Sequence, residues 1–224
     1  MTLTERRVAA ADLRAILAAL EAVAGAGRTL EAAELRRATG ALAAEAEDRV
    51  EAFTFGASLA ECFRLARAAG ATLDAMDRVR ASITPRISHG PASLAVLQTG
   101  IRLALITSAR IVAATVFVSR QDVDAALARL VPAFDAATEF AADRLDQTNF
   151  RALTALQAAL VRDLTQRARP LPRMVSYSLP RRRPALAIAN LFYGDGSRVE
   201  ELVAENRGMV HPLFAPASGR RLSA

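Results

Sequence analysis

The sequence predicts a mainly α-helical protein, with a multi-helix bundle over residues 1–168 followed by a small β-α-α-β module over residues 169–224. Hydrophobic residues make up 52% of the chain but aromatic residues only 5%, so the core must consist mostly of Ala, Leu, Val and Ile. Ala and Leu favour helix, and apolar residues recur at helical spacing as far as residue 168. Residues 167–184 then hold four prolines and six arginines, which cannot continue a helix.

The first four predicted helices cover residues 2–83. Thr2 and Glu5 have the spacing of a capping box, which begins the first helix, and the Gly-Ala-Gly stretch at 25–27 ends it. Thr29 is the expected N-cap of the second helix, and Gly70 is expected to stop the third. The expected spans of the second, third and fourth helices are 29–53, 58–69 and 72–83.

The most apolar part of the chain, residues 93–118, predicts a buried core helix after a loop over residues 83–93 that contains two prolines. It includes Arg102 and Arg110, and an arginine in mid-span costs about 3 kcal/mol in a bilayer. The N-terminal residues lead into an amphipathic stretch, which argues against a signal peptide. We therefore expect a soluble protein with no membrane partner.

Two further long helices are expected before the composition changes. Ser119 and Asp122 have the spacing of an N-cap for the first of them, and Pro132 lies inside it and is expected to kink it. Gln147-Thr148-Asn149 is expected to break the run. The predicted spans of these two helices are 120–145 and 150–168.

The sequence offers no convincing catalytic or metal-binding set, so we expect no enzyme activity, cofactor or metal. The single cysteine, Cys62, lies in an apolar run and is interpreted as a small buried side chain that cannot form an internal disulfide. Two isolated histidines, His89 and His211, do not complete a metal site with it. Carboxylate pairs that could serve acid–base chemistry are interpreted as solvated surface groups: Asp143 with Asp146, and Glu200 with Glu201.

Every basic residue is an arginine, and the whole net charge of +6 lies in the C-terminal part. Residues 1–161 carry 18 arginines and 18 acidic residues, whereas residues 162–224 carry 11 arginines and 5 acidic residues. The run Arg181-Arg182-Arg183 is the best candidate for nucleic-acid contacts, because clustered arginines neutralise phosphates. Only Tyr177 is an interleaved aromatic, so a solvated loop or a protein-facing patch is favoured over nucleic acid.

The stretch LFYGDGSRVEELVAENR, residues 191–207, predicts two short helices joined by a tight turn. A phosphate-binding loop would follow a strand and carry a lysine, but this turn follows a predicted helix and the chain has no lysine. Gly194 fits the left-handed residue that ends the first helix, and Ser197 fits the cap of the second. Extended segments on both sides give the order strand, helix, helix, strand. The expected small core consists of Ala187, Ile188, Leu191, Val199, Leu202 and Val203.

This order and its key residues resemble the LysM module. That module has an apolar first helix, a Tyr-Gly-Asp turn, a second helix that ends in Asn, and a proline-containing return. The matching residues are Ile188-Ala189, Tyr193-Gly194-Asp195, Leu202, Asn206, His211-Pro212 and Pro216.

A longer stretch, residues 156–216, resembles the C-terminal region of the Mu-like phage DNA circularisation proteins, also called N proteins. That family has a helix ending in VRDLT, an LPR-x-V-x-Y segment, a short proline-led helix, YGD, and RADEL-like and ARNRI-HP-like blocks. The corresponding blocks here are Val161 to Thr165, Leu171 to Tyr177, Arg198 to Leu202, and Ala204 to Pro212.

The chain departs from the family pattern in two places. Gly208-Met209-Val210 stands where the family has a shorter turn before His-Pro. Family members carry an N-terminal β-rich domain that resembles tail-tube folds, whereas this chain starts in predicted helices. Either that domain is encoded separately or this chain is a reduced variant.

The resemblance implies a non-enzymatic structural component of a phage tail, or of a phage-derived tail such as a prophage remnant. Its expected place is the baseplate hub or the region where the tail tube begins, after assembly in the bacterial host cytoplasm. Expected partners are hub, wedge, tube or tape-measure proteins, with several copies in a ring. Two other functions stay open: a DNA-binding or circularisation protein that uses the basic segment, and a peptidoglycan-binding tail accessory.

The LysM-like module is expected to join neighbouring proteins rather than to bind glycan, because no exposed aromatic groove is evident. The candidate partner-binding residues all lie in this basic module: Arg173, Tyr177, Arg181, Arg182, Arg183, Tyr193, Asp195 and Asn206.

Overall fold

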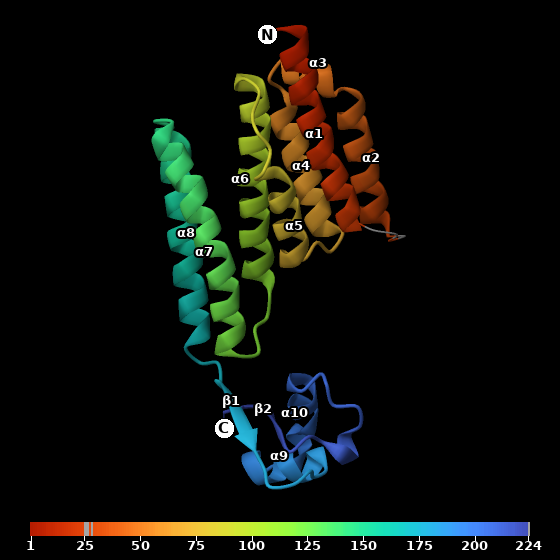
Figure 1. Ribbon diagram of the computed structural model, residues 1–224, viewed down its shortest axis with the longest axis vertical. Helices are drawn as coiled ribbons and strands as arrows, with labels where there is room; N and C mark the ends of the chain where they lie inside the picture. Colours follow the sequence, from red (N-terminus) through yellow and green to blue (C-terminus); the bar gives the residue numbers. More distant parts are fainter. Residues whose placement is uncertain (25–26, 28, 224) are drawn as a thin grey trace. The chain divides into compact units, whose positions relative to one another are not determined.

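The computed structural model describes residues 1–24, 27 and 29–223 (Figure 1). The fold is mainly α-helical with one small two-stranded sheet, as the sequence predicts. The chain divides into two compact units. Unit 1 comprises Met1–Thr115 and Leu130–Leu160, and unit 2 comprises Val116–Arg129 and Val161–Ala224. The long helices α7 (Arg120–Asp143) and α8 (Gln147–Ala168) contribute residues to both units.

Six helices that belong wholly to unit 1 pack against one another around a core of mainly aliphatic side chains (Figure 1). Among them, α6 contacts α1, α4 and α5 most extensively and α3 to a smaller extent, so it forms one wall of the core. The bounds of the six helices are α1 Leu3–Ala24, α2 Leu30–Ala44, α3 Ala46–Glu51, α4 Phe55–Ala68, α5 Leu73–Ile83 and α6 Pro91–Ala114.

The local signals for helix ends in unit 1 are confirmed where the structure describes them. Thr2 and Glu5 exchange capping-box hydrogen bonds, and the Thr29 hydroxyl accepts a hydrogen bond from the Ala32 N–H. Gly70 has a φ of 88° after the end of α4, and the Ala71 N–H donates to the Ala66 carbonyl at 3.0 Å, as in a Schellman end. The predicted break at 25–27 lies largely outside the described residues.

Two predicted helix spans near the N-terminus are wrong. The span 29–53 is two helices, because Glu45 leaves helical geometry at φ −90° and ψ 8° between α2 and α3. The next helix, α4, begins at Phe55 rather than at residue 58. Phe53 has a left-handed φ of 53°, so the chain turns there and enters α4 three residues earlier than expected.

Two predicted boundaries of the later long helices are also wrong. α6 ends at Ala114 rather than at residue 118, because Thr115 is extended with a ψ of 134° and begins a β-branched stretch that disfavours helix. α8 begins at Gln147, so the predicted break lies inside the helix. Asp146 explains this start, because its carboxylate accepts a hydrogen bond from the Asn149 N–H at 3.2 Å, as an N-cap does.

The apolar helix α6 is a buried core helix, as the sequence predicts. Among the described residues it is the one helix long and apolar enough to cross a membrane, and 56% of its most apolar stretch is buried within the protein. Gly100 allows a close approach to α1, since a Cβ there would lie 2.7 Å from Ile16 Cδ1. Arg102 is paired with Asp146 at 3.0 Å.

Unit 2 has the predicted order of strand, helix, helix, strand. The strands are antiparallel, and Tyr177 lies opposite Gly219 in their register. The Ser119–Asp122 cap at the start of α7 is confirmed, with the Ser119 N–H donating to the Asp122 carboxylate at 3.0 Å. The bounds are β1 Met174–Ser178, α9 Ala185–Tyr193, α10 Val199–Glu205 and β2 Ser218–Leu222, with 3-10 turns η1 Gly196–Arg198 and η2 Pro212–Phe214.

The small core of unit 2 matches the prediction in part. Ile188 and Leu202 are fully buried, and Val199 and Val203 pack against them. The other two predicted core residues, Ala187 and Leu191, are exposed. The face of α9 that is turned inward carries Ala185, Ile188, Ala189 and Phe192, and the stripe that holds residues 187 and 191 faces solvent.

Candidate partner-binding surface

The hydrogen bonds at the ends of the sheet show which residues of each strand face outward. The Ser223 N–H donates to the Arg173 carbonyl at 2.7 Å, and the Leu179 N–H donates to the Ala217 carbonyl at 2.6 Å. Antiparallel bonding alternates along a strand, so the odd-numbered residues of β1 face β2. The even-numbered residues of both strands, 174, 176 and 178 in β1 and 218, 220 and 222 in β2, therefore face the two outer edges.

Asn206 closes the outer edge of β2. Its Nδ2 donates to the Arg220 carbonyl at 2.7 Å, and its Oδ1 accepts from the Arg220 N–H at 2.9 Å. The same Nδ2 donates to the Leu202 carbonyl at 2.7 Å, near the end of α10. One side-chain amide thus takes the place of a neighbouring strand residue and ties α10 to β2.

Gly219 is required where β2 passes Asn206. A Cβ at this position would press against the Asn206 Oδ1 and would lie 2.7 Å from the Tyr177 hydroxyl oxygen. Both approaches are too short for a real contact; Asn206 is held by its bonds to Arg220, and Tyr177 is buried. We infer that a side chain at position 219 would displace Asn206 from the strand edge.

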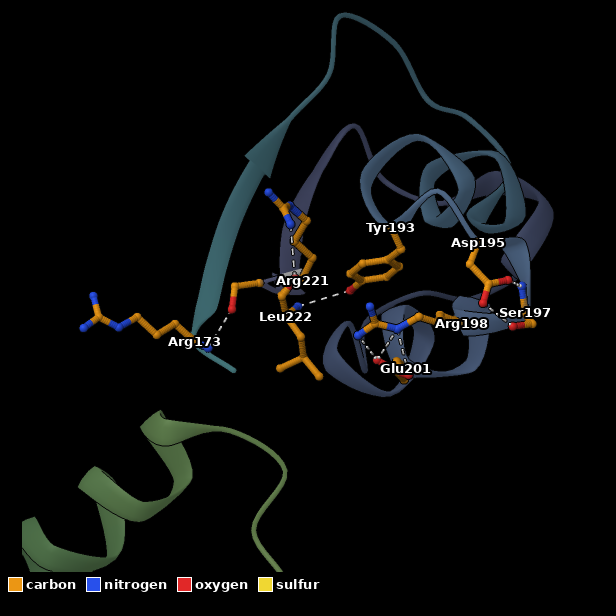
Figure 2. A network of polar contacts seen from close by, with 9 residues as sticks. Arg173, Tyr193, Asp195, Ser197, Arg198, Glu201, Arg221 and Leu222 are labelled. Carbon is orange, nitrogen blue, oxygen red and sulfur yellow. Dashed lines mark hydrogen bonds and ion pairs between the residues drawn. The ribbon is translucent and has the colours of Figure 1, made fainter. Parts of the chain in front are cut away.

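Tyr193 closes the same edge two residues further along β2. Its hydroxyl accepts a hydrogen bond from the Leu222 N–H at 3.1 Å (Figure 2). The Arg198 guanidinium lies over the Tyr193 ring, 4.1 Å from its centroid, and pairs with Glu201 at 2.8 Å. The Tyr193 ring is therefore held from two sides, which fixes the end of α9 against β2.

The Tyr193-Gly194-Asp195 turn ends one helix and starts the next. Gly194 has a φ of 68°, which confirms the predicted left-handed ending of α9. The Asp195 carboxylate accepts hydrogen bonds from the Ser197 hydroxyl and from the Ser197 N–H, both at 2.8 Å, and these bonds lower the pKa of Asp195. The predicted cap at Ser197 is wrong, because Asp195 is the capping residue and Ser197 lies inside η1.

Tyr177 is a core residue of unit 2. It is 6% exposed, and its ring lies 5.3 Å from that of Phe192, measured between centroids. Burial raises the pKa of its hydroxyl. Its ring therefore stabilises the module and is not available for stacking on a base or a sugar while the module is folded.

The exposed arginines of the predicted set lie at the two ends of β1. Arg173 precedes the strand, and Arg181 and Arg182 follow it; all three are exposed. Their side chains form no hydrogen bond or ion pair with any residue that the structure describes. Arg183 is half-buried, because its backbone pairs with Ala215 in an isolated bridge.

The charge excess belongs to unit 2. By the printed sequence, unit 2 holds 13 arginines and 7 acidic residues, whereas unit 1 holds 16 of each. The difference of 13 − 7 accounts for the net +6 of the chain. An acidic partner would therefore be attracted to unit 2 at low ionic strength.

Gln121 is a contributor that sequence reasoning missed. From the first turn of α7, its Oε1 accepts from the Met174 N–H at 2.7 Å and its Nε2 donates to the Met174 carbonyl at 3.4 Å. Its neighbour Arg120 donates to the Leu171 carbonyl at 3.0 Å. Gln121 and Met174 are 53 positions apart, and no local pattern in the sequence could have indicated the pair.

Two side chains of unit 1 that the sequence singled out, Cys62 and Asp146, serve the stability of unit 1. Cys62 is buried, as predicted, and burial raises the pKa of its thiol to about 11, which keeps it protonated at neutral pH. Asp146, interpreted from the sequence as a solvated carboxylate, instead caps α8 and pairs with Arg102. Across the described residues, no group of three or more His, Cys, Asp or Glu side chains is placed to hold a metal ion.

The outcome is a small, tightly tied module with exposed cations. Comparison with protein-family models and with curated proteins finds no match to this chain. The geometry of unit 2 is therefore the basis on which a function is assigned.

Proposed function

We propose that the protein is a non-enzymatic structural component of a phage tail or phage-derived tail. In this role its LysM-like C-terminal module joins neighbouring proteins of the baseplate hub or of the tail-tube-initiation region. One observation carries the proposal: residues 174–222 fold as strand, helix, helix, strand around the Tyr193-Gly194-Asp195 turn, with Asn206 tying the second helix to the last strand. These are the elements and residues that the resemblance implies.

The surface of the module suits a joining role. Of its eight predicted residues, four hold the module together: Tyr177, Tyr193, Asp195 and Asn206. Arg173, Arg181 and Arg182 face solvent without partners among the described residues, and Arg183 is half-buried. A frame whose backbone is already ordered loses little backbone entropy when a partner docks, and the exposed arginines supply its positive charge. Several copies in a ring would multiply such contacts.

Removal of the gene from the phage or prophage tests this proposal. We expect negative-stain images of the resulting particles to show tails that are absent, aberrant in length or lacking a baseplate. A plasmid copy of the gene restores normal tails. Normal tails in the absence of the gene, at wild-type numbers, contradict the proposal.

A second candidate function is binding of duplex DNA, and the exposed arginines at the ends of β1 favour it. It predicts a gel shift of duplex DNA at low salt that weakens steeply as salt rises. The triple variant Arg181→Ala, Arg182→Ala, Arg183→Ala abolishes the shift under this hypothesis. The variant Arg36→Ala, Arg37→Ala, at exposed positions of unit 1, is the control that leaves it unchanged. No shift at low salt eliminates this candidate.

A further inference from the structure

Side chains bond to the backbone of three of the six residues that face the outer edges of the two-stranded sheet. On β2, Asn206 satisfies both backbone groups of Arg220, and the Tyr193 hydroxyl accepts from the Leu222 N–H. On β1, Gln121 satisfies both backbone groups of Met174 in the same two-bond manner. Unpaired strand edges promote unwanted pairing, and side chains that occupy them prevent it.

One stretch of edge is left open. By the alternation of the ladder, the N–H and C=O groups of Ser176 and Ser178 face away from β2. No side chain or backbone group of the described residues is bonded to these outward groups, and both serines are exposed. On β2 a single residue, Ser218, is in the same position, so β1 presents the longer template.

We propose that the β1 edge at Ser176 and Ser178 accepts an extended, acidic segment of another protein by antiparallel or parallel strand addition. Two outward residues supply two donors and two acceptors, spaced about 7 Å apart along the strand, which is the repeat that an added strand matches. The small serine side chains leave the approach to the edge open. In Figure 2, β2 and the two short helices lie on the other side of β1.

The charges around β1 specify an acidic segment. Arg173 stands before the strand and Arg181 and Arg182 follow it, so an added strand has exposed cations at both of its ends. A second copy of this chain is a poor occupant, because antiparallel pairing of two β1 edges would bring Arg173 of each copy close to the arginine run of the other. Like charges in close register are destabilising.

This inference deepens the joining role proposed above and rests on it for the biological identity of the partner. The hydrogen-bonding pattern of the edge does not depend on that role. The residue that separates strand addition from other docking modes is Ser176: a proline there removes only an outward N–H, which edge strands tolerate.

The test uses the full chain as bait for a yeast-displayed library of random twelve-residue peptides. We expect enrichment of peptides rich in Asp and Glu that bind wild type and the Ser176→Ala control equally. These peptides bind Ser176→Pro about tenfold more weakly, because one intermolecular hydrogen bond is lost and the proline ring blocks the approach. They also bind Arg181→Ala, Arg182→Ala more weakly, with a smaller dependence on salt.

A second measurement covers the case in which Ser176→Pro fails to fold. Hydrogen exchange of wild type with and without an enriched peptide is expected to slow at the Ser176 and Ser178 amides, while exchange at Arg220, already bonded to Asn206, is unchanged. The inference is overturned by a library that yields no binders, by binders without acidic enrichment, or by binders that protect neither serine. Self-association of the chain that protects these amides also overturns it.

The failures of the two proposals can be told apart. A library without binders, together with aberrant tails on gene removal, overturns strand addition and leaves the joining role in place. Enriched acidic binders together with normal tails on gene removal overturn the tail function and leave the edge as an interaction surface.

Discussion

At the scale of single residues, unit 2 is held together by side chains that hydrogen-bond to backbone groups as a neighbouring strand would. The amide of Asn206 serves three backbone groups on two elements, and Gln121 does the same for both groups of Met174. The Asn206 and Tyr193 positions were picked out in the sequence, whereas the Gln121 contact was not. Asparagine at a helix end and tyrosine before a Gly-Asp turn are local signals, but a pairing over 53 positions is not.

Replacement of Asn206 by Ala is expected to destabilise unit 2 by about 1–3 kcal/mol, because it leaves strand and helix-end groups without partners. Hydrogen exchange followed by mass spectrometry, on peptides that cover 199–222, measures this as faster exchange. The matched control is Asn190→Ala, since Asn190 is exposed on α9 and its side chain bonds to none of the described residues. Equal exchange in the two variants would show that the Asn206 bonds contribute little.

Asp146 is expected to make the stability of unit 1 depend on pH. Hydrogen bonds from the Asn149 side chain and N–H, with a smaller effect of Arg102, lower its pKa from the ordinary value of an aspartate. A carboxyl group whose folded-state pKa is lowered stabilises the fold above its unfolded pKa, and this stability is lost as pH falls through the folded value. Asp146→Asn should therefore show a smaller loss of stability between pH 6 and about pH 2.5.

Urea unfolding at the two pH values checks this expectation. The control is Asp143→Asn, an exposed carboxylate three positions away whose side chain bonds to none of the described residues. It should keep the wild-type difference between the two pH values. A wild-type difference in Asp146→Asn as well would contradict the assignment of this contribution to Asp146.

At the scale of elements, the sequence predicts those helix ends that a single residue type determines. Three helix ends could be predicted because each depends on a residue type that favours one backbone conformation or one capping hydrogen bond. They are the capping box at Thr2, the cap at Thr29 and the glycine end at Gly194. The α2–α3 break at Glu45 was not readable, because an Ala- and Glu-rich stretch carries no breaker. The prediction placed Ala187 and Leu191 on the inward face of α9, and this was wrong. Nearly all residues of α9 are apolar, so the pattern does not determine which side of the helix faces the core.

Two glycines of unit 1 should respond oppositely to alanine. Gly70→Ala is expected to destabilise unit 1 by about 1–2 kcal/mol, because its φ of 88° is left-handed. Gly40→Ala, inside α2 with open space around the added Cβ, is expected to stabilise it by about 0.5–1 kcal/mol. Thermal unfolding of the two variants measures both effects, and shifts of the same sign would contradict the conformational explanation.

At the scale of the whole molecule, the charge is divided by unit. Unit 1 has as many acidic residues as arginines, and a largely aliphatic core holds its helices; unit 2 holds the entire positive excess. The sequence predicts an uneven charge distribution of this kind, since residues 162–224 carry 11 arginines and 5 acidic residues. It could not show that exposed arginines lie at the ends of an open strand edge, because the edge exists only once β1 has paired with β2. We infer that recognition of a partner belongs to unit 2.

The most direct test of the central claim is cross-linking mass spectrometry of purified tails. We predict that the chain co-purifies with tails in a fixed copy number. We also predict that a reagent that links carboxylates to arginines joins acidic side chains of a second tail protein to unit 2, near Arg173 and Arg181, because the chain has no lysine. These cross-links are lost in the Ser176→Pro variant. Absence of the chain from purified tails, or cross-links confined to unit 1, would contradict it.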